Sequence, residues 1–398
     1  MPKLLQINST ANWGSTGKIA EQIGELVISK GWESYIAYGR YANKSKSKLI
    51  KIGSKLGMFC HLVESRLFDN HGLASRIATR QLVKEIKRIN PDIIHLHNIH
   101  GYYLNYKILF NYLNGVDTPV VWTLHDCWSF TGHCAHFIDA ECYKWKKGCK
   151  NCTKYKDYPS AYTDQSERNY EIKKLLFTYK NNIFLAPASK WLSDFVGESY
   201  FKGKKRDVFH NGINLNVFKP SEWEQTDKTK IIGVSSVWNK AKGLEDIYKL
   251  REILDPNKYD ITIVGLNQEQ KDNLPEGING ILRTNSAEEL AELYSNANVF
   301  VNPTYADTFP TTNLEALACG IPVITYRTGG SPESITPNTG YVVKQGDING
   351  VINAIKEIES RGKQYYSDAC RKYAEENFDK DKCFAKYIDL YNELLNTK

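Results

Sequence analysis

Long hydrophobic runs are absent from this sequence of 398 residues, and so is an apolar stretch near its N-terminus. Its apolar runs, such as Pro119–Leu124, have the length of a strand, whereas a membrane-spanning helix needs about 18 consecutive apolar residues. The N-terminus turns polar at Gln6 and Asn8, too soon for the apolar region of about 7 to 15 residues in a secretory signal. We therefore expect a cytoplasmic protein without a membrane span.

A strong excess of one charge is also absent. The chain has 52 Lys and Arg against 45 Asp and Glu, a formal net charge of +7, with 41% hydrophobic residues. This balance is typical of a globular protein and excludes intrinsic disorder. The nine cysteines are an odd number without an export signal, which favours reduced thiols or a metal site over disulfides. The modest positive charge fits nucleic acid, an anionic membrane face or phosphorylated small molecules, and does not choose among them.

The sequence does contain an alternation of short β-rich apolar runs with longer helical patterns. Such alternation is typical of parallel sheets built from β-α-β units, so the predicted fold class is α/β. In the first half the predicted strands are 3–8, 33–38, 92–97, 119–124, 183–188 and 206–210. In the second half they are 230–235, 259–264, 278–282, 299–302, 322–326 and 340–343.

A polar segment, Asn214–Lys230, separates the two series and lacks helical or strand periodicity, which predicts a linker. We therefore expect two Rossmann-like domains that face each other across a cleft. The N-terminal acceptor domain covers 1–213 with a cysteine-rich insertion at 127–160, and the C-terminal donor domain covers 214–379. The last segment, 380–398, has one apolar helical face and is expected to pack back on the N-terminal domain.

The stretch from Asp307 to Ile324 is the most informative part of the sequence. After a predicted strand and a loop, a short helix begins near Thr311 and ends at Gly320. Ligands of parallel sheets bind outside the carboxyl ends of the strands, so this helix should point its N-terminus into the predicted crevice. Its unpaired backbone N–H groups and positive dipole end favour a phosphate or diphosphate.

Polar side chains around this helix start suit such a ligand. Thr311, Thr312 and Asn313 can add side-chain donors to the backbone N–H groups. Asp307 and Glu315 are separated by seven residues, so they can bracket the ligand and accept hydrogen bonds from its hydroxyl groups. The alternative for either carboxylate alone is a helix cap or a solvated side chain.

These residues resemble the hallmark of the large GT-B glycosyltransferase family 4, whose members are retaining enzymes that use nucleotide sugars. The hallmark is two acidic residues separated by seven others and followed by a Gly-x-Pro-Val turn. Here the acids are Asp307, where the family usually has Glu, and Glu315, and the turn is Gly320–Val323. The resemblance implies that Asp307 contacts the donor sugar during catalysis and that Glu315 binds the nucleotide ribose.

Three basic residues of the predicted second domain extend this resemblance. Lys242 follows the first strand of that domain and is expected to neutralise the leaving diphosphate, as a catalytic cation. Family members usually add an arginine where this chain has Val237, and we expect Lys240 to replace the missing charge. Arg283 lies after the predicted strand 278–282 and is a candidate contact of the donor base.

A glycine-rich turn follows the first strand of the predicted first domain. The run Gly14-Ser15-Thr16-Gly17-Lys18 opens a helix, but its spacing excludes a P-loop because Ile19 replaces the required Ser or Thr. By the resemblance, Gly14, Ser15 and Gly17 approach the donor phosphates or the acceptor. A plain strand-to-helix turn is the alternative.

Histidines end two strands of the predicted first domain. His125 matches the family's active-site histidine, and we assign it a positioning or electrostatic role near the donor sugar rather than nucleophilic attack. Alternation places His95 and His97 on one face of the sheet, where they can form a metal pair or line the acceptor side of the cleft. We favour the lining role.

Four cysteines fall within the insertion that follows the strand before His125. They are Cys134, Cys142, Cys149 and Cys152, and the last two form a C-x-x-C pair. Four thiols so spaced can close a tetrahedral structural zinc site without an open position for chemistry. The alternatives are free thiols or a set in which His133 or His136 replaces one cysteine.

These observations predict a retaining, metal-independent glycosyltransferase. It moves a sugar from a UDP- or GDP-sugar to a glycan or lipid-linked glycan, by family analogy in bacterial surface polysaccharide synthesis with peripheral contact at the inner membrane face. We expect no nucleic-acid partner, because a nucleic-acid binder would not explain the segment from Asp307. The alternatives are a nucleotide-sugar epimerase, another enzyme of this architecture such as a phosphorylase, or a non-catalytic nucleic-acid or sugar binder.

Overall fold

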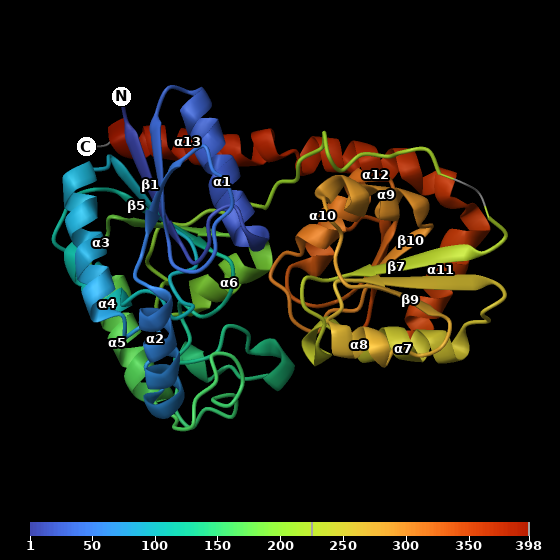
Figure 1. Cartoon of the computed structure of the whole chain (residues 1–398), viewed down its shortest axis with the longest axis horizontal. Helices are drawn as coiled ribbons and strands as arrows, with labels where there is room; N and C mark the ends of the chain where they lie inside the picture. Colours follow the sequence, from blue (N-terminus) through green and yellow to red (C-terminus); the bar gives the residue numbers. More distant parts are fainter. Residues whose placement is uncertain (224–225, 397–398) are drawn as a thin grey trace. The chain divides into compact units, whose positions relative to one another are not determined.

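The computed structural model describes residues 1–223 and 226–396 (Figure 1). The chain divides into two compact units, the first formed by Met1–His210 with Phe384–Lys398 and the second by Asn211–Cys383. Each unit is built on one six-stranded parallel sheet. The predicted fold class, two Rossmann-like α/β units, is therefore confirmed.

The first unit has the strand order β3-β2-β1-β4-β5-β6. Its strands are β1 (Lys3–Asn8), β2 (Glu33–Tyr38), β3 (Lys48–Lys51), β4 (Ile93–Leu96), β5 (Val120–Leu124) and β6 (Ile183–Pro187). Its helices are α1 (Gly14–Ser29), α2 (Lys55–Phe68), α3 (Arg76–Ile89), α4 (Tyr106–Leu113), α5 (Ser166–Thr178) and α6 (Lys190–Glu198). The strand order reverses between β1 and β4, which makes their carboxyl ends the topological switch point of this sheet.

The second unit repeats this topology with the order β12-β11-β10-β7-β8-β9. Its strands are β7 (Thr229–Val234), β8 (Tyr259–Val264), β9 (Ile278–Ile281), β10 (Val299–Asn302), β11 (Val323–Tyr326) and β12 (Gly340–Val343). Its helices are α7 (Leu244–Ile253), α8 (Gln268–Asp272), α9 (Ala287–Asn296), α10 (Thr311–Ala318), α11 (Ile348–Arg361) and α12 (Lys363–Asn377). Here the switch point lies between β7 and β10.

The last helix, α13 (Lys380–Asn396), is held on the first sheet by two tyrosines. The Tyr391 hydroxyl lies 2.6 Å from Nδ1 of His95, and the Tyr387 hydroxyl lies 2.8 Å from the hydroxyl of Thr123. Both tyrosines are buried, and so are His95 and Thr123. The C-terminal residues thus cover β4 and β5 and complete the core of the first unit.

Two details of the strand prediction are wrong. The prediction missed β3, a short strand whose residues are mostly exposed at the edge of the sheet. Residues 206–210 were predicted as a strand but form only a single bridge, between Leu185 and Arg206, beside β6. Charged residues in β3 hide the apolar signal on which the prediction depended, as is common in edge strands.

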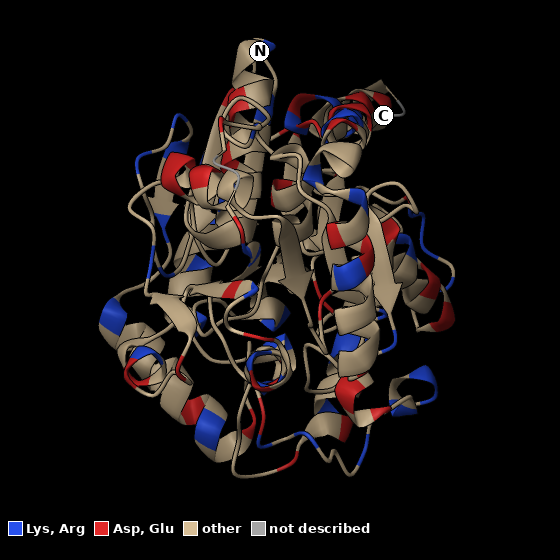
Figure 2. Ribbon diagram, turned by 90° about the vertical axis from the view of Figure 1, so that its right-hand side faces the viewer, with Lys and Arg blue, Asp and Glu red and all other residues tan. Residues whose placement is uncertain are grey.

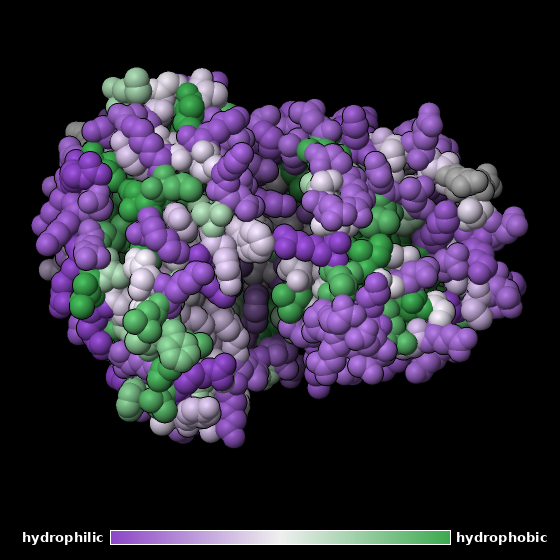
Figure 3. All heavy atoms as spheres, in the orientation of Figure 1, coloured by the Kyte–Doolittle hydropathy of each residue, from purple (hydrophilic) through white to green (hydrophobic). Residues whose placement is uncertain are grey.

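The surface of the molecule is mixed in charge and polarity. Lys and Arg are interspersed with Asp and Glu on the side drawn in Figure 2. Figure 3 shows hydrophobic atoms gathered over α2, in the orientation of Figure 1. Among the helices that the structure describes, none combines the length and the apolar character needed to cross a membrane.

Candidate functional site

Two loops meet at the switch point of the second sheet. The loop after β7 contains a short 3-10 helix, Lys240–Lys242, and the loop after β10 leads into α10. The N–H of Tyr305 donates to the carbonyl oxygen of Ala241 at 2.8 Å, which fastens one loop to the other. Because β7 and β10 are neighbours in the sheet, side chains far apart in the sequence come together here.

Lys242 and Asp307 form an ion pair at this point. The Lys242 ammonium lies 2.6 Å from Oδ2 of Asp307 and also donates to the carbonyl oxygen of Ala306 at 3.2 Å. The other carboxylate oxygen accepts the N–H of Phe309 at 3.2 Å, which fixes the loop. The two side chains are 31% and 21% exposed, so water screens the pair and each group can still reach a ligand. The structure thus brings together two residues singled out in the sequence.

The N-terminus of α10 follows immediately. Its N-cap residue is Pro310, and in the part of the chain that the structure describes no side chain caps the helix. The side chains of Thr311 and Thr312 are partly exposed in its first turn. A helix end with uncapped N–H groups carries a partial positive charge, so it suits an anion.

Asn313 does not belong to this exposed helix end, contrary to the prediction. Its side chain is fully buried, and its amide donates to the hydroxyls of Ser331 and Ser334 at 3.1 and 2.9 Å. Its carbonyl oxygen accepts from the amide of Asn302 at 2.8 Å. Since all of these hydrogen bonds join α10 to β10 and to the loop after β11, Asn313 stabilises the fold instead of offering a donor to a ligand.

Glu315 lies on the next turn of the same helix and is partly exposed. Its Oε2 accepts a hydrogen bond from the hydroxyl of buried Tyr294 at 3.1 Å. Burial and, after it, the charge of Glu315 raise the pKa of Tyr294, so this hydroxyl stays a donor. The tyrosine therefore holds the carboxylate of Glu315 in one orientation.

Gly329 supports the loop of Asp307, and the sequence prediction missed it. Its backbone φ is +56°, and a Cβ atom there would lie 1.7 Å from the carbonyl oxygen of Asp307. Only glycine permits this approach of the loop after β11 to the loop after β10. The Gly329-Gly330 pair was the available signal in the sequence.

A buried carboxylate beneath the loops was also missed. Asp246 on α7 accepts hydrogen bonds from the hydroxyls of Tyr305 and Tyr326, at 2.6 and 2.8 Å. These bonds tie the loop after β10 to β11 and to the helix that follows Lys242. No local pattern marks Asp246, because its partners come from other strands.

The remaining basic candidates of the second unit are Lys240 and Arg283. Lys240 is exposed on the turn before Lys242. Arg283 is exposed just after β9, which is the edge strand, so β8 separates it from β7 in the sheet. The structure does not group Arg283 with the residues at the switch point.

The glycine-rich turn of the first unit lies at the switch point of its own sheet. Gly14 has a φ of +63°, and both Gly14 and Ser15 are exposed at the start of α1. Gly17 is buried, and a Cβ atom there would lie 2.6 Å from the hydroxyl of Thr10. Gly17 therefore serves the packing of the turn, whereas Gly14 and Ser15 remain accessible.

His125 lies at the carboxyl end of β5 and belongs to a chain of polar contacts. Its Nε2 is 3.3 Å from Nδ1 of His97, whose other ring nitrogen is 3.0 Å from the amide oxygen of Gln6. Burial lowers the pKa of His125 to about 4, so the ring is neutral near pH 7. A neutral ring can orient a ligand through a hydrogen bond but brings no positive charge.

The neighbouring Asp126 pairs with His100 at 2.8 Å. Burial opposes the charge of Asp126. The charge and hydrogen bond of His100, together with the charge of His136 and the N–H of Trp128, outweigh burial and lower the pKa of the carboxyl to about 2. His95, in contrast, does not line a cleft as predicted. It is fully buried between Thr123 and Tyr391, because α13 covers that part of the sheet.

The four cysteines of the insertion line one small cavity of about 20 Å³. Burial raises the pKa of Cys134 to about 12 and those of Cys149 and Cys152 to about 11. Within residues 1–223 and 226–396, no group of three or more His, Cys, Asp or Glu residues is placed to hold a metal ion. The structure therefore gives no support to the predicted zinc ion.

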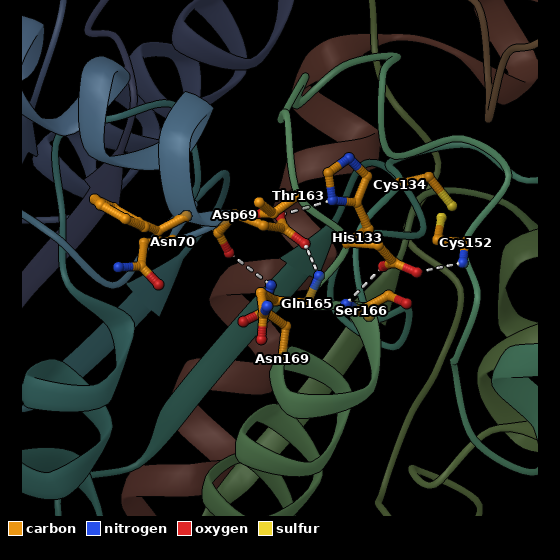
Figure 4. A network of polar contacts seen from close by, with 12 residues as sticks. Asp69, Asn70, His133, Cys134, Cys152, Thr163, Gln165, Ser166 and Asn169 are labelled. Carbon is orange, nitrogen blue, oxygen red and sulfur yellow. Dashed lines mark hydrogen bonds and ion pairs between the residues drawn. The ribbon is translucent and has the colours of Figure 1, made fainter.

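His133, the alternative ligand, has another partner. Its Nδ1 lies 2.8 Å from the carboxylate of buried Asp69, which also accepts the N–H of Gln165 (Figure 4). The N–H of Cys152 in turn donates to Asp164 at 2.7 Å. This polar network ties the insertion to the end of α2.

Comparisons with known proteins cover both units. Residues 218–377 match the family model described as "Glycosyl transferases group 1", a range that contains Lys242, Asp307 and α10. Over 376 residues the chain is 25% identical to "Putative colanic acid biosynthesis glycosyl transferase WcaC" of Escherichia coli K12, covering 89% of this chain and 90% of that protein.

Two solved structures extend the likeness to the whole chain. Sucrose-phosphate synthase from Thermosynechococcus elongatus has a TM-score of 0.72 at 16% identity, and each chain is fully covered (100%). Anabaena HepE, solved in complex with UDP-glucose, has a TM-score of 0.63 at 14% identity, again with 100% coverage of both. These likenesses show that the chain has the GT-B fold.

Proposed function

We propose that the protein is a retaining glycosyltransferase of family 4 that moves a sugar from a nucleotide-sugar donor to a glycan or lipid-linked glycan acceptor. The observation that carries this proposal is the pairing of Lys242 with Asp307 beside the uncapped N-terminus of α10. These residues lie within the range that matches group 1 glycosyl transferases. The name of the colanic acid relative supports a role in surface polysaccharide synthesis, and the HepE complex supports a nucleotide-sugar donor.

In this proposal the second unit holds the donor. The N–H groups at the start of α10, with the hydroxyls of Thr311 and Thr312, bind the diphosphate. Lys242 turns from Asp307 to the phosphate and neutralises the charge that develops as the sugar leaves. Asp307 then accepts hydrogen bonds from sugar hydroxyls, and Glu315 from the ribose. Lys240 and Arg283 are proposed as outer contacts of the donor.

The proposed transfer retains the anomeric configuration by attack on the face from which the nucleotide departs. The acceptor oxygen bonds to the anomeric carbon as the bond from that carbon to the phosphate oxygen breaks. The acceptor proton passes to the departing phosphate oxygen, so no protein nucleophile takes part. Lysine and the helix end supply the positive charge, and the proposal assigns no role to a divalent ion.

The first unit is proposed to act on the sugar and the acceptor. His125 is neutral near pH 7, so its proposed part is to position the transferred sugar through a hydrogen bond. Gly14 and Ser15, exposed at the start of α1, are proposed to approach the donor phosphates or the acceptor. A lipid-linked acceptor would bring the protein to a membrane surface.

Labelled UDP- and GDP-sugars, supplied with a lipid-linked glycan extract, test the proposal. We expect one donor to be transferred, and Lys242→Ala to lower the rate by about 100-fold or more without loss of folding. Lys258→Ala removes an exposed lysine away from the loops and is the matched control. Equal rates for the two variants would contradict the assignment of Lys242. An isomerised donor as the product would favour an epimerase instead.

A further inference from the structure

Helix α2 is amphipathic in the reverse sense of an ordinary surface helix. Its buried positions are polar, since His61 and Ser65 are each 1% exposed. His61 contacts the hydroxyl of Ser75 at 2.8 Å and accepts the N–H of Gly72 at 3.1 Å. The outward residues are instead apolar: Leu56, Phe59, Val63, Leu67 and Phe68 are 72, 60, 39, 45 and 56% exposed. A helix normally buries such a stripe, so this one is suited to an external partner.

The apolar surface continues beyond the helix. An open groove of about 630 Å³ is lined by four residues of the stripe and by four others: Phe59, Val63, Leu67 and Phe68, with Cys60, Glu64, Asn70 and Arg76. At the C-terminal end of α2, the N–H of Tyr162 donates to the carbonyl oxygen of Arg66 at 2.7 Å, and the tyrosine side chain is itself exposed. Figure 3 shows the hydrophobic atoms over α2 as one group.

The segment around this stripe is strongly basic. Residues 40–90 contain 12 Lys and Arg but only 3 Asp and Glu, a net charge of +9, which leaves 40 basic and 42 acidic residues in the rest of the chain. Lys55 at the start of α2, Arg66 near its end, and Arg76 and Arg80 on α3 are all exposed. Arg76 also pairs with Glu64 of α2 at 2.8 Å, so it holds α3 beside the stripe. The excess positive charge of the whole protein is therefore concentrated in the segment of the chain that contains its exposed apolar helix.

We propose that α2 and the adjoining basic residues of α3 form a docking surface for an anionic lipid bilayer. The stripe from Leu56 to Phe68 would enter the boundary between headgroups and acyl chains, and the flanking cations would pair with lipid phosphates. A single acidic protein partner fits less well, because the cations lie at both ends of α2 and on α3. This inference rests on and deepens the proposed function, since a lipid-linked acceptor would lie in the same bilayer.

Sedimentation with lipid vesicles tests the proposal in the absence of any sugar donor. We expect the full chain to bind vesicles of phosphatidylcholine with phosphatidylglycerol, and to bind vesicles of phosphatidylcholine alone about tenfold less. Phe59→Ser, Val63→Ser and Leu67→Ser together should lower binding to the anionic vesicles by about tenfold or more. Since these side chains are exposed, the circular dichroism spectrum and nucleotide binding should not change.

Leu175→Ser with Ile253→Ser is the matched control, because both residues are exposed and lie on other helices. Equal binding by the triple variant and this control would overturn the proposal. The proposal would also be overturned if the wild-type chain did not bind anionic vesicles. It would be overturned as well if light scattering showed that the triple variant differs from the wild type only in its state of self-association. Failure of sugar transfer with intact vesicle binding would count against the proposed function and not against the docking surface.

Discussion

At the scale of single residues, the candidate site depends on backbone contacts as much as on charged side chains. Gly329 lies against the carbonyl oxygen of Asp307 with a φ of +56°. We expect Gly329→Ala to push this loop away, to lower transfer by more than about tenfold and to destabilise the protein by about 2 kcal/mol. Urea unfolding and the transfer assay measure the two effects.

Gly362 provides the control for this substitution. Its φ is +77°, but no atom lies within 4 Å of the Cβ that alanine would add. Gly362→Ala should therefore meet no steric clash and leave transfer unchanged. It should cost about 1 to 3 kcal/mol of backbone strain, because a φ of 77° with a ψ of 153° is adopted almost only by glycine. Comparable losses of transfer in the two variants would contradict the role assigned to Gly329.

The sequence marks the charged residues of the candidate site but not the residues that support them. Lys242, Asp307 and Glu315 were identified from short motifs and from their places after predicted strands. The burial of Asn313 and the approach of Gly329 depend on loops from different strands, which are distant in sequence. Such contacts leave no periodic signal, so these two positions could not be assigned correctly from the sequence.

At the scale of elements, α13 contributes a buried hydrogen bond to the first unit. The Tyr391 hydroxyl contacts His95 at 2.6 Å, and both residues are buried. Tyr391→Phe leaves a ring nitrogen of His95 without this partner, so we expect a loss of about 1 to 3 kcal/mol in the free energy of unfolding. Denaturant unfolding checks the value.

Tyr179→Phe is the companion variant, because Tyr179 is 73% exposed. Its loss should stay within about 0.5 kcal/mol. Similar losses for the two variants would mean that the hydroxyl of Tyr391 does not stabilise the fold.

The strands were predicted almost completely because parallel sheets bury continuous apolar runs. Of the strands in the described residues, the prediction missed β3, whose exposed edge position requires little apolar character. The outward orientation of the apolar stripe of α2 could not be predicted either. Its helical spacing is that of a buried face, and no feature of the sequence alone indicates that this face points outward.

At the scale of the whole molecule, the two units differ in their histidine content. All nine lie at or before His210, so the second unit has none. Burial lowers the pKa of His61 and of His125 to about 4, and those of His71, His95 and His97 fall well below their usual value. The folded first unit therefore holds these rings neutral where the unfolded chain would protonate them.

This difference predicts that acid weakens one unit before the other. The histidines of the unfolded chain bind protons near pH 6.5, whereas the buried rings of the folded unit do not. The first unit therefore keeps its full stability above pH 6.5 and loses stability as the pH falls toward 4. Between pH 7 and pH 5 we expect the first unit to lose stability and the second to change little. Hydrogen exchange of the full chain, read by mass spectrometry for each unit, measures both. Equal losses in the two units would contradict this prediction.

The ion pair at the second switch point has a consequence for selectivity. Because Lys242 already has a carboxylate partner, the two charges of the pair largely cancel each other at the switch point. A monophosphate can bind the ammonium of Lys242 only if the lysine gives up its favourable interaction with Asp307. In the proposed site a diphosphate engages the helix end with one phosphate and the lysine with the other, so the additional contact offsets the loss of the ion pair. Under the proposed function, we therefore expect a nucleoside diphosphate to bind better than a monophosphate before any sugar is recognised.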